Sequence, residues 1–323
     1  MKAIVQDVYG PPGVLGLRDI ARPAPGDRQV LVRVRAAGVD QGVWHLMTGL
    51  PYLLRLFGYG LTKPKIPVRG REVAGVVEAV GPGVTRFAAG DEVFGTCDGS
   101  FAEYVCAKED KLARKPTGLS FEEAAASPIS GVTALQAVRD AGQVTVGQRV
   151  LILGAGGGVG SFGVQLAKAF GADVTGVCSS GKVELVRSLG ADAVIDYAKT
   201  DMAGYGKPYD VILDTAGNRP LSLLRRLLGP KGTLVIIGGE GGGKLTGGFQ
   251  RSLAAPLVSL FSGRKFKGLV AKETHLDLEA LASLIEAGSV KPAVDRVFPL
   301  AEAPAAIQYL HEGRARGKVV VSV

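Results

Sequence analysis

The chain has 323 residues, of which 46% are hydrophobic and 21% charged, and its net charge is +8. This length and composition predict two globular domains with apolar cores, and they exclude a disordered or repetitive chain. The 38 Lys and Arg residues are dispersed and form no basic tract, which argues against a nucleic-acid-binding protein.

The first residues and the cysteines bear on the compartment. MKAIVQDVYG enters an alternating strand pattern instead of a charged and apolar leader, and no apolar run reaches the length of a membrane helix. The three cysteines, Cys97, Cys106 and Cys178, share no CxxC spacing, which argues against a disulfide framework and a structural zinc cluster. We therefore expect a cytoplasmic protein with no membrane span.

The first hundred residues read as a β region, because short alternating runs are separated by Gly- and Pro-rich turns. The expected strands are 2–6, 29–39, 71–81, 91–95 and 100–107. Ser120 and Glu123 then have the spacing of a capping box, and alanine-rich sequence follows. One helix is expected from there to about Gly142.

From Gln148 onward the pattern alternates between apolar strands and amphipathic helices. The six expected strands are 149–154, 173–177, 193–196, 209–214, 233–239 and 266–271. Continuous apolar strands between helices predict a parallel sheet covered on both faces, and six is the number in a doubly wound Rossmann fold. Helices at 276–288 and 300–313 and a strand at 317–323 are expected to complete the chain.

A glycine-rich turn follows the first of these six strands. Ala155, Gly157 and Gly160 occupy the three glycine positions of a GxGxxG motif between a strand and a helix. Such a turn lets the backbone approach a pyrophosphate at the helix N-terminus. A glycine-rich packing turn without a ligand is the alternative. The candidate cofactor-binding residues here are Ala155, Gly156, Gly157, Gly158, Val159 and Gly160.

The end of the next strand indicates which dinucleotide binds. NAD sites place Asp or Glu there for the ribose hydroxyls, whereas this chain has Ser179, Ser180 and Lys182. Hydroxyls and a lysine suit a 2′-phosphate, so the sequence predicts NADPH. In the alternative interpretation, the serines cap the following helix and Lys182 is a solvated surface residue. Tyr197, after the third strand, is a further candidate for the phosphate edge.

Several motifs in a fixed order resemble one family along the whole chain. They are MKAIV, AAGVDQGVWHLMTG, GREVAGVVEAVGPGVTRFAAGDEVFG, GSFAEYV, SPISGVTALQAV, AGGGVG, VTGVCSS, GADAVIDY, YDVILDTAGN and GKVVVSV. The chain thereby resembles the medium-chain dehydrogenase/reductase superfamily, in its zinc-independent quinone oxidoreductase branch. The resemblance implies an α/β protein with a GroES-like β domain and a Rossmann domain, and a homodimer built edge to edge on the Rossmann sheet.

The resemblance also implies domain limits and further sites. The GroES-like catalytic domain is expected at 1–125, completed by 272–323, and the Rossmann NADPH-binding domain at 126–271. By resemblance, Thr133 approaches the nicotinamide end, Asp214 and Asn218 lie on the adenosine side, and Gly238 and Gly239 contact the nicotinamide ribose.

The zinc ligands of the superfamily are absent from the matching positions. In its zinc alcohol dehydrogenases the metal is held by a Cys after the AAG strand, a His in a GHE motif and a Cys before GVT. This chain has Asp40, Arg71 and Ile129 at those positions. Arginine and isoleucine offer no zinc-binding atom, so the sequence predicts an enzyme without catalytic zinc.

Asp40 and Arg71 are candidate catalytic residues. Our hypothesis is that they form an ion pair beside the nicotinamide and that Arg71 stabilises the oxyanion of a reduced quinone. Alternatively Arg71 is a strand-end residue whose charge is merely satisfied by Asp40 or Glu72. In the family branch that the chain resembles, the position of Asp40 is commonly Asn, and this chain departs from that pattern.

Tyr52 is the third candidate, in the segment GLPYLLRLFGYGLTK, which also contains Tyr59. The apolar side chains of this segment could roof a planar substrate, or they could simply cover the β domain. The sequence favours the second interpretation.

Loss of the metal restricts the chemistry. Without a Lewis acid, a simple ketone lacks the usual stabilisation of its developing alkoxide, whereas a quinone or an enone spreads the charge over its conjugated system. The sequence therefore predicts NADPH-dependent hydride transfer to quinones or α,β-unsaturated carbonyls. The alternative is an NADPH-binding protein of the same fold with a regulatory or structural role.

Overall fold

A computed structural model describes residues 1–202, 208–239 and 243–323 of the chain. Two compact units are present: unit 1 comprises 1–132, 273–288 and 292–323, and unit 2 comprises 133–272 and 289–291. The division expected after residue 125 thus lies at Val132 and Thr133, and the return to unit 1 begins at Glu273.

Unit 1 is built from mainly antiparallel sheets, in which only β14 and β15 among the described strands pair in parallel, around a valine-rich core. A seven-stranded sheet has the order β14, β15, β3, β4, β5, β7, with β6 paired to β3, and β1 pairs separately with β2. The strands are β1 (Lys2–Val5), β2 (Gly16–Asp19), β3 (Gln29–Val39), β4 (Glu72–Val80), β5 (Glu92–Thr96), β6 (Tyr104–Lys108), β7 (Leu112–Arg114), β14 (Val294–Pro299) and β15 (Lys318–Ser322).

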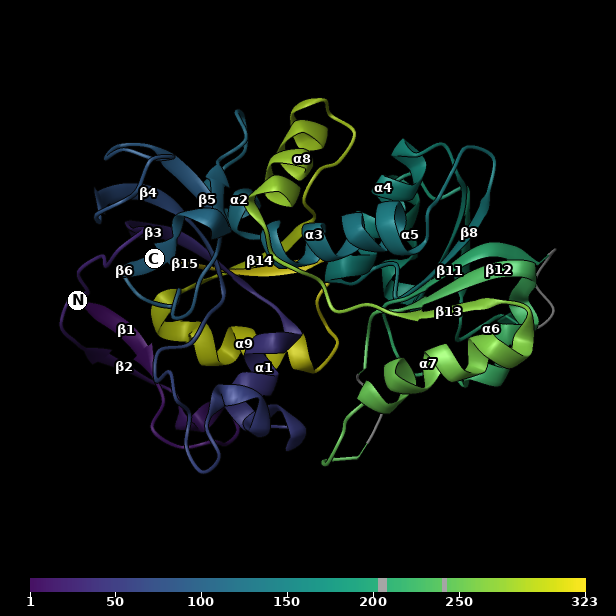
Figure 1. Cartoon of the computed structure of the whole chain (residues 1–323), viewed down its shortest axis with the longest axis horizontal. Helices are drawn as coiled ribbons and strands as arrows, with labels where there is room; N and C mark the ends of the chain where they lie inside the picture. The colour runs from purple at the N-terminus through teal and green to yellow at the C-terminus, as the bar shows by residue number, and fades with distance from the viewer. Residues whose placement is uncertain (203–207, 240–242) are drawn as a thin grey trace. The chain divides into compact units, whose positions relative to one another are not determined.

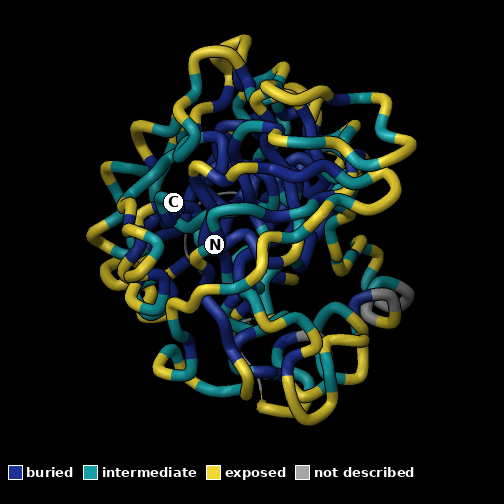
Figure 2. The backbone as a smooth tube through the Cα atoms, turned by 90° about the vertical axis from the view of Figure 1, so that its left-hand side faces the viewer, coloured by how far each residue is buried: buried dark blue, intermediate teal, exposed yellow. Residues whose placement is uncertain are grey.

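The pattern along β3 shows why this strand is central. Val32, Val34 and Ala36 are buried, whereas Arg33 and Arg35 between them are exposed, which is the period of two that a half-buried strand requires. The buried valines join a cluster with residues of β4, β5 and β6. Figure 2 shows the burial of the whole backbone, with buried stretches in the interior and exposed stretches at the outer turns.

The helices of unit 1 come from three parts of the chain. They are α1 (Gln41–Thr48), α2 (Phe121–Ala125), α8 (His275–Glu286) and α9 (Ala303–His311). Helix α9 packs against α1 and β15, α2 against β3 and β4, and α8 against β7. The last strand, β15, pairs with β3 in the interior of the sheet, so the end of the chain is part of the unit formed by its beginning.

Unit 2 contains one parallel six-stranded sheet, as predicted. Its order is β10, β9, β8, β11, β12, β13, the doubly wound arrangement of dinucleotide-binding domains. The strands are β8 (Arg149–Leu153), β9 (Asp173–Cys178), β10 (Ala193–Asp196), β11 (Tyr209–Asp214), β12 (Leu228–Ile236) and β13 (Lys265–Gly268). All six contain residues of the runs expected from the sequence.

Helices cover both faces of this sheet. They are α4 (Gly158–Ala169), α5 (Val183–Ser188), α6 (Leu221–Leu227) and α7 (Phe249–Ser262). Figure 1 shows α4 and α5 on one face and α6 and α7 on the other. Because both faces are covered, β8 and β11 consist of nearly continuous buried apolar residues.

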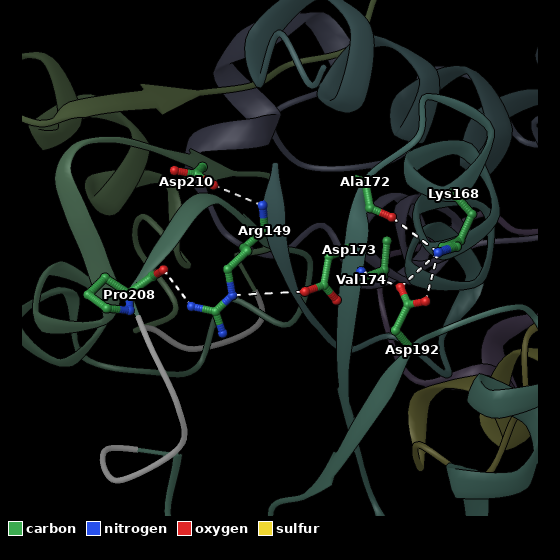
Figure 3. Close-up of polar contacts among 8 residues, drawn as sticks. All are labelled: Arg149, Lys168, Ala172, Asp173, Val174, Asp192, Pro208 and Asp210. Carbon is green, nitrogen blue, oxygen red and sulfur yellow. Dashed lines mark hydrogen bonds and ion pairs between the residues drawn. The ribbon is translucent and has the colours of Figure 1, made fainter. Parts of the chain in front are cut away.

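Charged side chains form hydrogen bonds with backbone groups at the amino ends of the strands in unit 2 (Figure 3). The Lys168 Nζ lies 2.8 Å from each carboxylate oxygen of Asp192 and donates to the carbonyl oxygen of Ala172 at 3.2 Å. The backbone N–H of Val174 donates to the same Asp192 carboxylate at 2.7 Å. One carboxylate therefore joins α4 to the start of β9.

Arg149 makes the equivalent connection at the start of β8. Its backbone N–H donates to the Asp210 carboxylate at 2.8 Å, and its guanidinium donates to the carbonyl oxygen of Pro208 at 2.8 Å (Figure 3). These contacts lie at the amino ends of the strands. The carboxyl ends, where ligands bind in open parallel sheets, face the opposite edge.

One helix prediction was wrong in its extent. The capping box is present, because the Ser120 side chain accepts from the Glu123 N–H and the Glu123 side chain accepts from the Ser120 N–H. The helix ends at Ala125, however, and a second helix, α3 (Pro128–Gln136), begins at Pro128. A proline has no N–H to donate to the preceding turn, so it is favoured at the start of a new helix.

No helix in the described ranges is both long and apolar enough to cross a membrane.

Candidate functional site

The glycine-rich turn joins β8 to α4 and leaves no room for side chains. A Cβ on Gly160 would lie 2.1 Å from the carbonyl oxygen of Gly154, and Gly154 itself has a φ of +77°. Gly157 is the N-cap residue of α4, and no side chain in the described part of the chain caps that helix. The first-turn N–H groups, with no acidic residue among them, therefore suit a phosphate.

Lys182 lies against this turn. A Cβ on Gly156 would be 2.7 Å from the Lys182 Cβ and 2.9 Å from its Cδ. The structure thus brings the lysine that follows β9 next to the glycine motif. This contact depends on Gly156, because any larger residue at that position would displace the lysine side chain.

The two serines after β9 differ in their contacts. Ser179 makes no side-chain capping bond within the described chain, and the Ser180 hydroxyl hydrogen-bonds Asp196, which lowers the pKa of that carboxyl. Neither serine therefore caps the helical turn, as the alternative interpretation required. The Asp196 carboxylate is balanced by Lys199, whose Nζ lies 3.7 Å away.

Tyr197 follows β10 and is half exposed, and the guanidinium of Arg219 lies 5.4 Å from the centre of its ring. Sequence reasoning missed Arg219. Its position in the sequence could have indicated it, because Arg219 directly follows Asn218 in the loop at the carboxyl end of the fourth strand. A second cation beside the 2′-phosphate could be expected in that loop. Asn218 itself is exposed.

Asp214 is engaged in the interior of unit 2. It is fully buried, its Oδ2 accepts from Arg251 at 2.7 Å, and its Oδ1 accepts from the Gly217 N–H at 2.9 Å. The carboxylate thus holds α7 and the loop after β11. Arg251 was not foreseen, because a partner on a later helix leaves no local pattern in the sequence.

The remaining cofactor candidates occupy tight backbone positions. A Cβ on Gly238 would lie 2.1 Å from the carbonyl oxygen of Thr215, and one on Gly239 would lie 3.2 Å from the Gly248 Cα. Gly238 is therefore required for close packing after β12, whereas a side chain at Gly239 would need only a small shift of Gly248. Thr133 is half buried in α3 and is the first residue of unit 2.

The fit of unit 2 to a dinucleotide follows from these observations. The glycine turn has no side chains in the way, the N-terminus of α4 has open N–H groups, and β9 ends in a neutral cysteine and serines rather than a carboxylate. Lys182 adds a positive charge beside the turn. The residues present fit the pyrophosphate of a nicotinamide dinucleotide at this turn.

In unit 1, Arg71 precedes β4 and binds a carboxylate that the sequence did not indicate. Its Nη2 donates to the Oε1 of Glu273 at 2.7 Å, and each side chain is about three-quarters buried. Lys111 donates its Nζ to the backbone carbonyl of the same Glu273 at 2.5 Å. Glu273, at the start of the segment that returns to unit 1, is therefore fixed at both its backbone and its side chain.

Asp40 lies on the other side of Arg71. A Cβ on Gly42 would be 2.6 Å from the Asp40 Oδ1 and 3.0 Å from the Arg71 Nη1, so the two charges are neighbours across this glycine. The hydrogen bond of Asp40 goes to the N–H of Val43, at 3.2 Å, where it caps α1. Its Oδ2 is buried without a hydrogen-bond partner in the described chain.

The ion pair expected between Asp40 and Arg71 is thus only partly realised. The hydrogen-bonded partner of Arg71 is Glu273, and Asp40 acts on it through its nearby charge. Burial alone would lower the pKa of Arg71, but the charges of Asp40 and Glu273 raise it above its ordinary value. Arg71 therefore remains a cation held between two carboxylates.

Glu72 was the other partner considered for Arg71, and that alternative was wrong. Glu72 is fully buried, its Oε2 forms an ion pair with the buried Lys318 of β15, and its Oε1 accepts from the Ile129 N–H at 2.9 Å. Burial raises the pKa of Glu72, although Lys318 opposes that effect. The adjacent residues Arg71 and Glu72 thus form ion pairs with two different partners, and the charge of Asp40 acts on both.

The segment with Tyr52 and Tyr59 is mostly exposed. The Tyr52 ring is stacked with the Arg55 guanidinium, 4.8 Å from its centre, and is half exposed. Tyr59 lines a small cavity with Arg69 and Asp98, and its hydroxyl is close enough to influence the pKa of Arg71. The structure therefore brings Tyr59, rather than Tyr52, toward the catalytic candidates.

The positions of the zinc ligands contain Asp40, Arg71 and Ile129 in the structure as in the sequence. Ile129 contributes only its backbone N–H, to Glu72. Over residues 1–202, 208–239 and 243–323, no three His, Cys, Asp or Glu side chains are grouped as a metal site would require.

Comparisons with known proteins agree with this architecture. The family model described as alcohol dehydrogenase GroES-like domain matches residues 26–117, and the one described as zinc-binding dehydrogenase matches residues 189–321. The chain is 35% identical to a 2-methylene-furan-3-one reductase of Solanum lycopersicum, over 99% of this chain and 79% of that protein. It is 34% identical to a quinone oxidoreductase of Pseudomonas aeruginosa, over 99% of both.

A solved structure extends the comparison. The quinone oxidoreductase of Escherichia coli complexed with NADPH superposes with a TM-score of 0.86, at 26% identity, and each chain is fully covered. Sequence and fold thus match over the full length. The chain belongs to the medium-chain dehydrogenase/reductase superfamily of oxidoreductases, in its quinone oxidoreductase branch.

Proposed function

We propose that this protein is a zinc-independent, NADPH-dependent reductase that transfers hydride to quinones or α,β-unsaturated carbonyls. The observation that carries the proposal is Arg71, a cation held between Glu273 and Asp40 at the position where zinc enzymes of the superfamily have a histidine ligand. A fixed positive charge there can meet the charge that develops on an acceptor oxygen.

Unit 2 supplies the cofactor side of the proposal. When bound, NADPH supplies the hydride. The open N–H groups at the start of α4 would bind its pyrophosphate, and Lys182, Ser179 and Arg219 would bind the 2′-phosphate. Strand β9 itself ends in no carboxylate, and the Asp196 carboxylate at the end of the neighbouring β10 is hydrogen-bonded by Ser180 and lies 3.7 Å from the Lys199 Nζ. The choice of NADPH over NADH rests on these residues.

Unit 1 supplies the acceptor side. The Arg71 guanidinium has a rigid fork of donors, and Glu273 uses one of its nitrogens, the Nη2. Glu273 orients the group, and Asp40 keeps it charged. A conjugated acceptor needs less stabilisation than a simple ketone, because its own π-system spreads the negative charge. Arg71 is thus sufficient for quinones or enones but not for unactivated ketones.

The proposal is tested by following NADPH oxidation with 1,4-benzoquinone, with a 2-alkenal, with a simple ketone and without acceptor. We expect turnover with the quinone or the alkenal, none with the ketone, and no loss of rate after dialysis against a chelator. A second experiment tests the cofactor: the assay is repeated with NADH in place of NADPH, and with the Lys182→Ala variant in place of the wild type. The variant should raise the KM for NADPH about tenfold and leave the KM for NADH unchanged.

Other outcomes would contradict the proposal. Tight NADPH binding without turnover on any acceptor would favour the alternative, a binding protein of the same fold. A rate that depends on added zinc would contradict the metal-free reaction. A preference of the wild type for NADH would overturn the cofactor assignment.

We also propose a homodimer and a reducing compartment. Strand β13 is an edge of the six-stranded sheet and could pair with the same strand of a second copy, which sedimentation velocity tests directly. The three cysteines are free thiols, which fits the cytosol.

A further inference from the structure

Residues 50–66, called here the apolar loop, expose large apolar side chains. Leu56, Phe57 and Leu61 have exposed fractions of 70%, 69% and 64%. The sequence favoured an interpretation in which this segment covers the β domain, and for these three residues the structure contradicts it. In Figure 1 the loop follows α1 in unit 1. Single exposed apolar residues are ordinary, but three so close together indicate an interaction surface.

Hydrogen bonds from polar side chains connect the apolar loop to the rest of unit 1. The Tyr9 hydroxyl lies 2.8 Å and 2.7 Å from the carbonyl oxygens of Tyr59 and Gly60. Arg55 donates its Nε to the carbonyl oxygen of Gly49 at 2.9 Å, and its guanidinium stacks on the Tyr9 ring. The loop is thus a folded feature that presents apolar side chains to solvent.

All charged residues in and directly around the apolar loop, between residues 41 and 71, are positive. Residues 41–71 contain no Asp or Glu, and they include the exposed Lys63 and Lys65 beside the apolar side chains. Lys63 interacts electrostatically with Asp7, whose carboxylate also forms an ion pair with Arg18 at 2.7 Å. The apolar loop therefore combines exposed apolar groups with an excess of positive charge.

This combination identifies the kind of partner. Apolar side chains flanked by lysines suit the boundary between headgroups and acyl chains of an anionic bilayer, where burial and charge attraction act together. A second copy of this chain suits it less, because two loops of the same sign in a protein of net charge +8 would repel each other. We propose that the apolar loop docks this protein on an anionic lipid surface through Leu56, Phe57 and Leu61.

The docking claim does not depend on the acceptor, so it can be tested separately from the proposed function. The full-length protein is sedimented with vesicles of phosphatidylcholine alone and with vesicles in which a third of the lipid is phosphatidylglycerol. The test variants are Leu56→Ser/Phe57→Ser and Lys63→Gln/Lys65→Gln. The matched control is Val146→Ser/Leu276→Ser, which removes two apolar side chains of similar exposure, 83% and 66%, elsewhere on the surface.

We expect the wild type and the control to bind the anionic vesicles and to bind phosphatidylcholine weakly. The apolar variant should lose about tenfold or more in affinity, and the lysine variant should lose the preference for anionic lipid. All variants should keep the wild-type thermal unfolding, since the altered side chains are exposed.

Results of three kinds would overturn the docking proposal. The first is that the wild type binds neither vesicle, or that the control loses as much affinity as the apolar variant. The second is that the apolar variant raises the KM for soluble 1,4-benzoquinone while its vesicle binding is unchanged, which would make the loop a roof over the substrate. The third is that the variant changes the sedimentation coefficient without lipid and leaves vesicle binding intact, which would make the loop a contact between copies.

Discussion

At the scale of single residues, two charge systems begin at neighbouring positions. Arg71 pairs with Glu273 and Glu72 pairs with Lys318, and the partners are 202 and 246 positions away in the chain. Arg71 and Asp40 could be predicted as candidates from the sequence, because they occupy positions where zinc enzymes of the superfamily have metal ligands. Nothing local to Glu273 or Lys318 marks them as partners, because such pairs depend on the folding of distant segments together.

The buried pair Glu72–Lys318 leads to a stability prediction. Lys318→Met leaves the Glu72 carboxylate buried without its counter-charge, and breaking a buried pair in this way costs about 3–5 kcal/mol in the free energy of unfolding. The double variant Glu72→Gln/Lys318→Met should recover most of that loss, since the glutamine oxygen can still accept from the Ile129 N–H. Urea unfolding of the single and double variants measures both. Equal losses in the two would show that Lys318 contributes by packing rather than by charge.

At the scale of elements, periodicity predicted the six strands of unit 2 and the main strands of unit 1. It missed β2, β7 and β14, which are short or largely exposed and therefore show little alternation. It also joined α2 and α3 into one helix, because alanine-rich sequence continues on both sides of Pro128. Local pattern thus identifies long strands that bury a face, and it fails where a strand is short or largely exposed or where one residue interrupts a helix.

Asp192, which connects α4 to β9, gives a pH prediction. Burial alone would raise its pKa, but hydrogen bonds from Lys168 and the Val174 N–H lower the pKa below its ordinary value. A carboxyl whose pKa is lowered by folding stabilises the fold above its unfolded pKa of about 3.9, and that contribution is lost as the pH falls through the lower folded pKa. Asp192→Asn should therefore destabilise by about 1 kcal/mol or less at neutral pH, since the pair is partly exposed.

The measurement is the urea midpoint of wild type and Asp192→Asn as a function of pH. The difference between them should narrow as the pH is lowered toward about 3. Glu184→Gln, in the exposed pair with Arg187, is the control and should change little at any pH. A difference that stays constant with pH would rule out the carboxylate charge as its cause.

At the scale of the whole molecule, the chain forms two units from interleaved segments. Unit 1 needs residues 273–288 and 292–323 as well as the first 132 residues, and its sheet contains β15 next to β3. Sequence pattern predicted a strand at 317–323 but could not show which sheet it joins; only the resemblance to a family implied this. The division of labour between the units, cofactor binding in one and charge stabilisation in the other, is the core of the proposed function.

The most direct test of that function is kcat/KM for 1,4-benzoquinone with saturating NADPH, measured for wild type, Arg71→Lys and Arg71→Leu. Removing the fixed charge should lower kcat/KM about a hundredfold in Arg71→Leu, with the KM for NADPH unchanged, and Arg71→Lys should retain part of the activity. Because Arg71→Leu leaves the carboxylates of Glu273 and Asp40 without their cation, its melting temperature should fall, and circular dichroism checks that the variant is folded at the assay temperature. A folded Arg71→Leu variant with wild-type kcat/KM would contradict the account, because the cation between Glu273 and Asp40 would then have only a structural role.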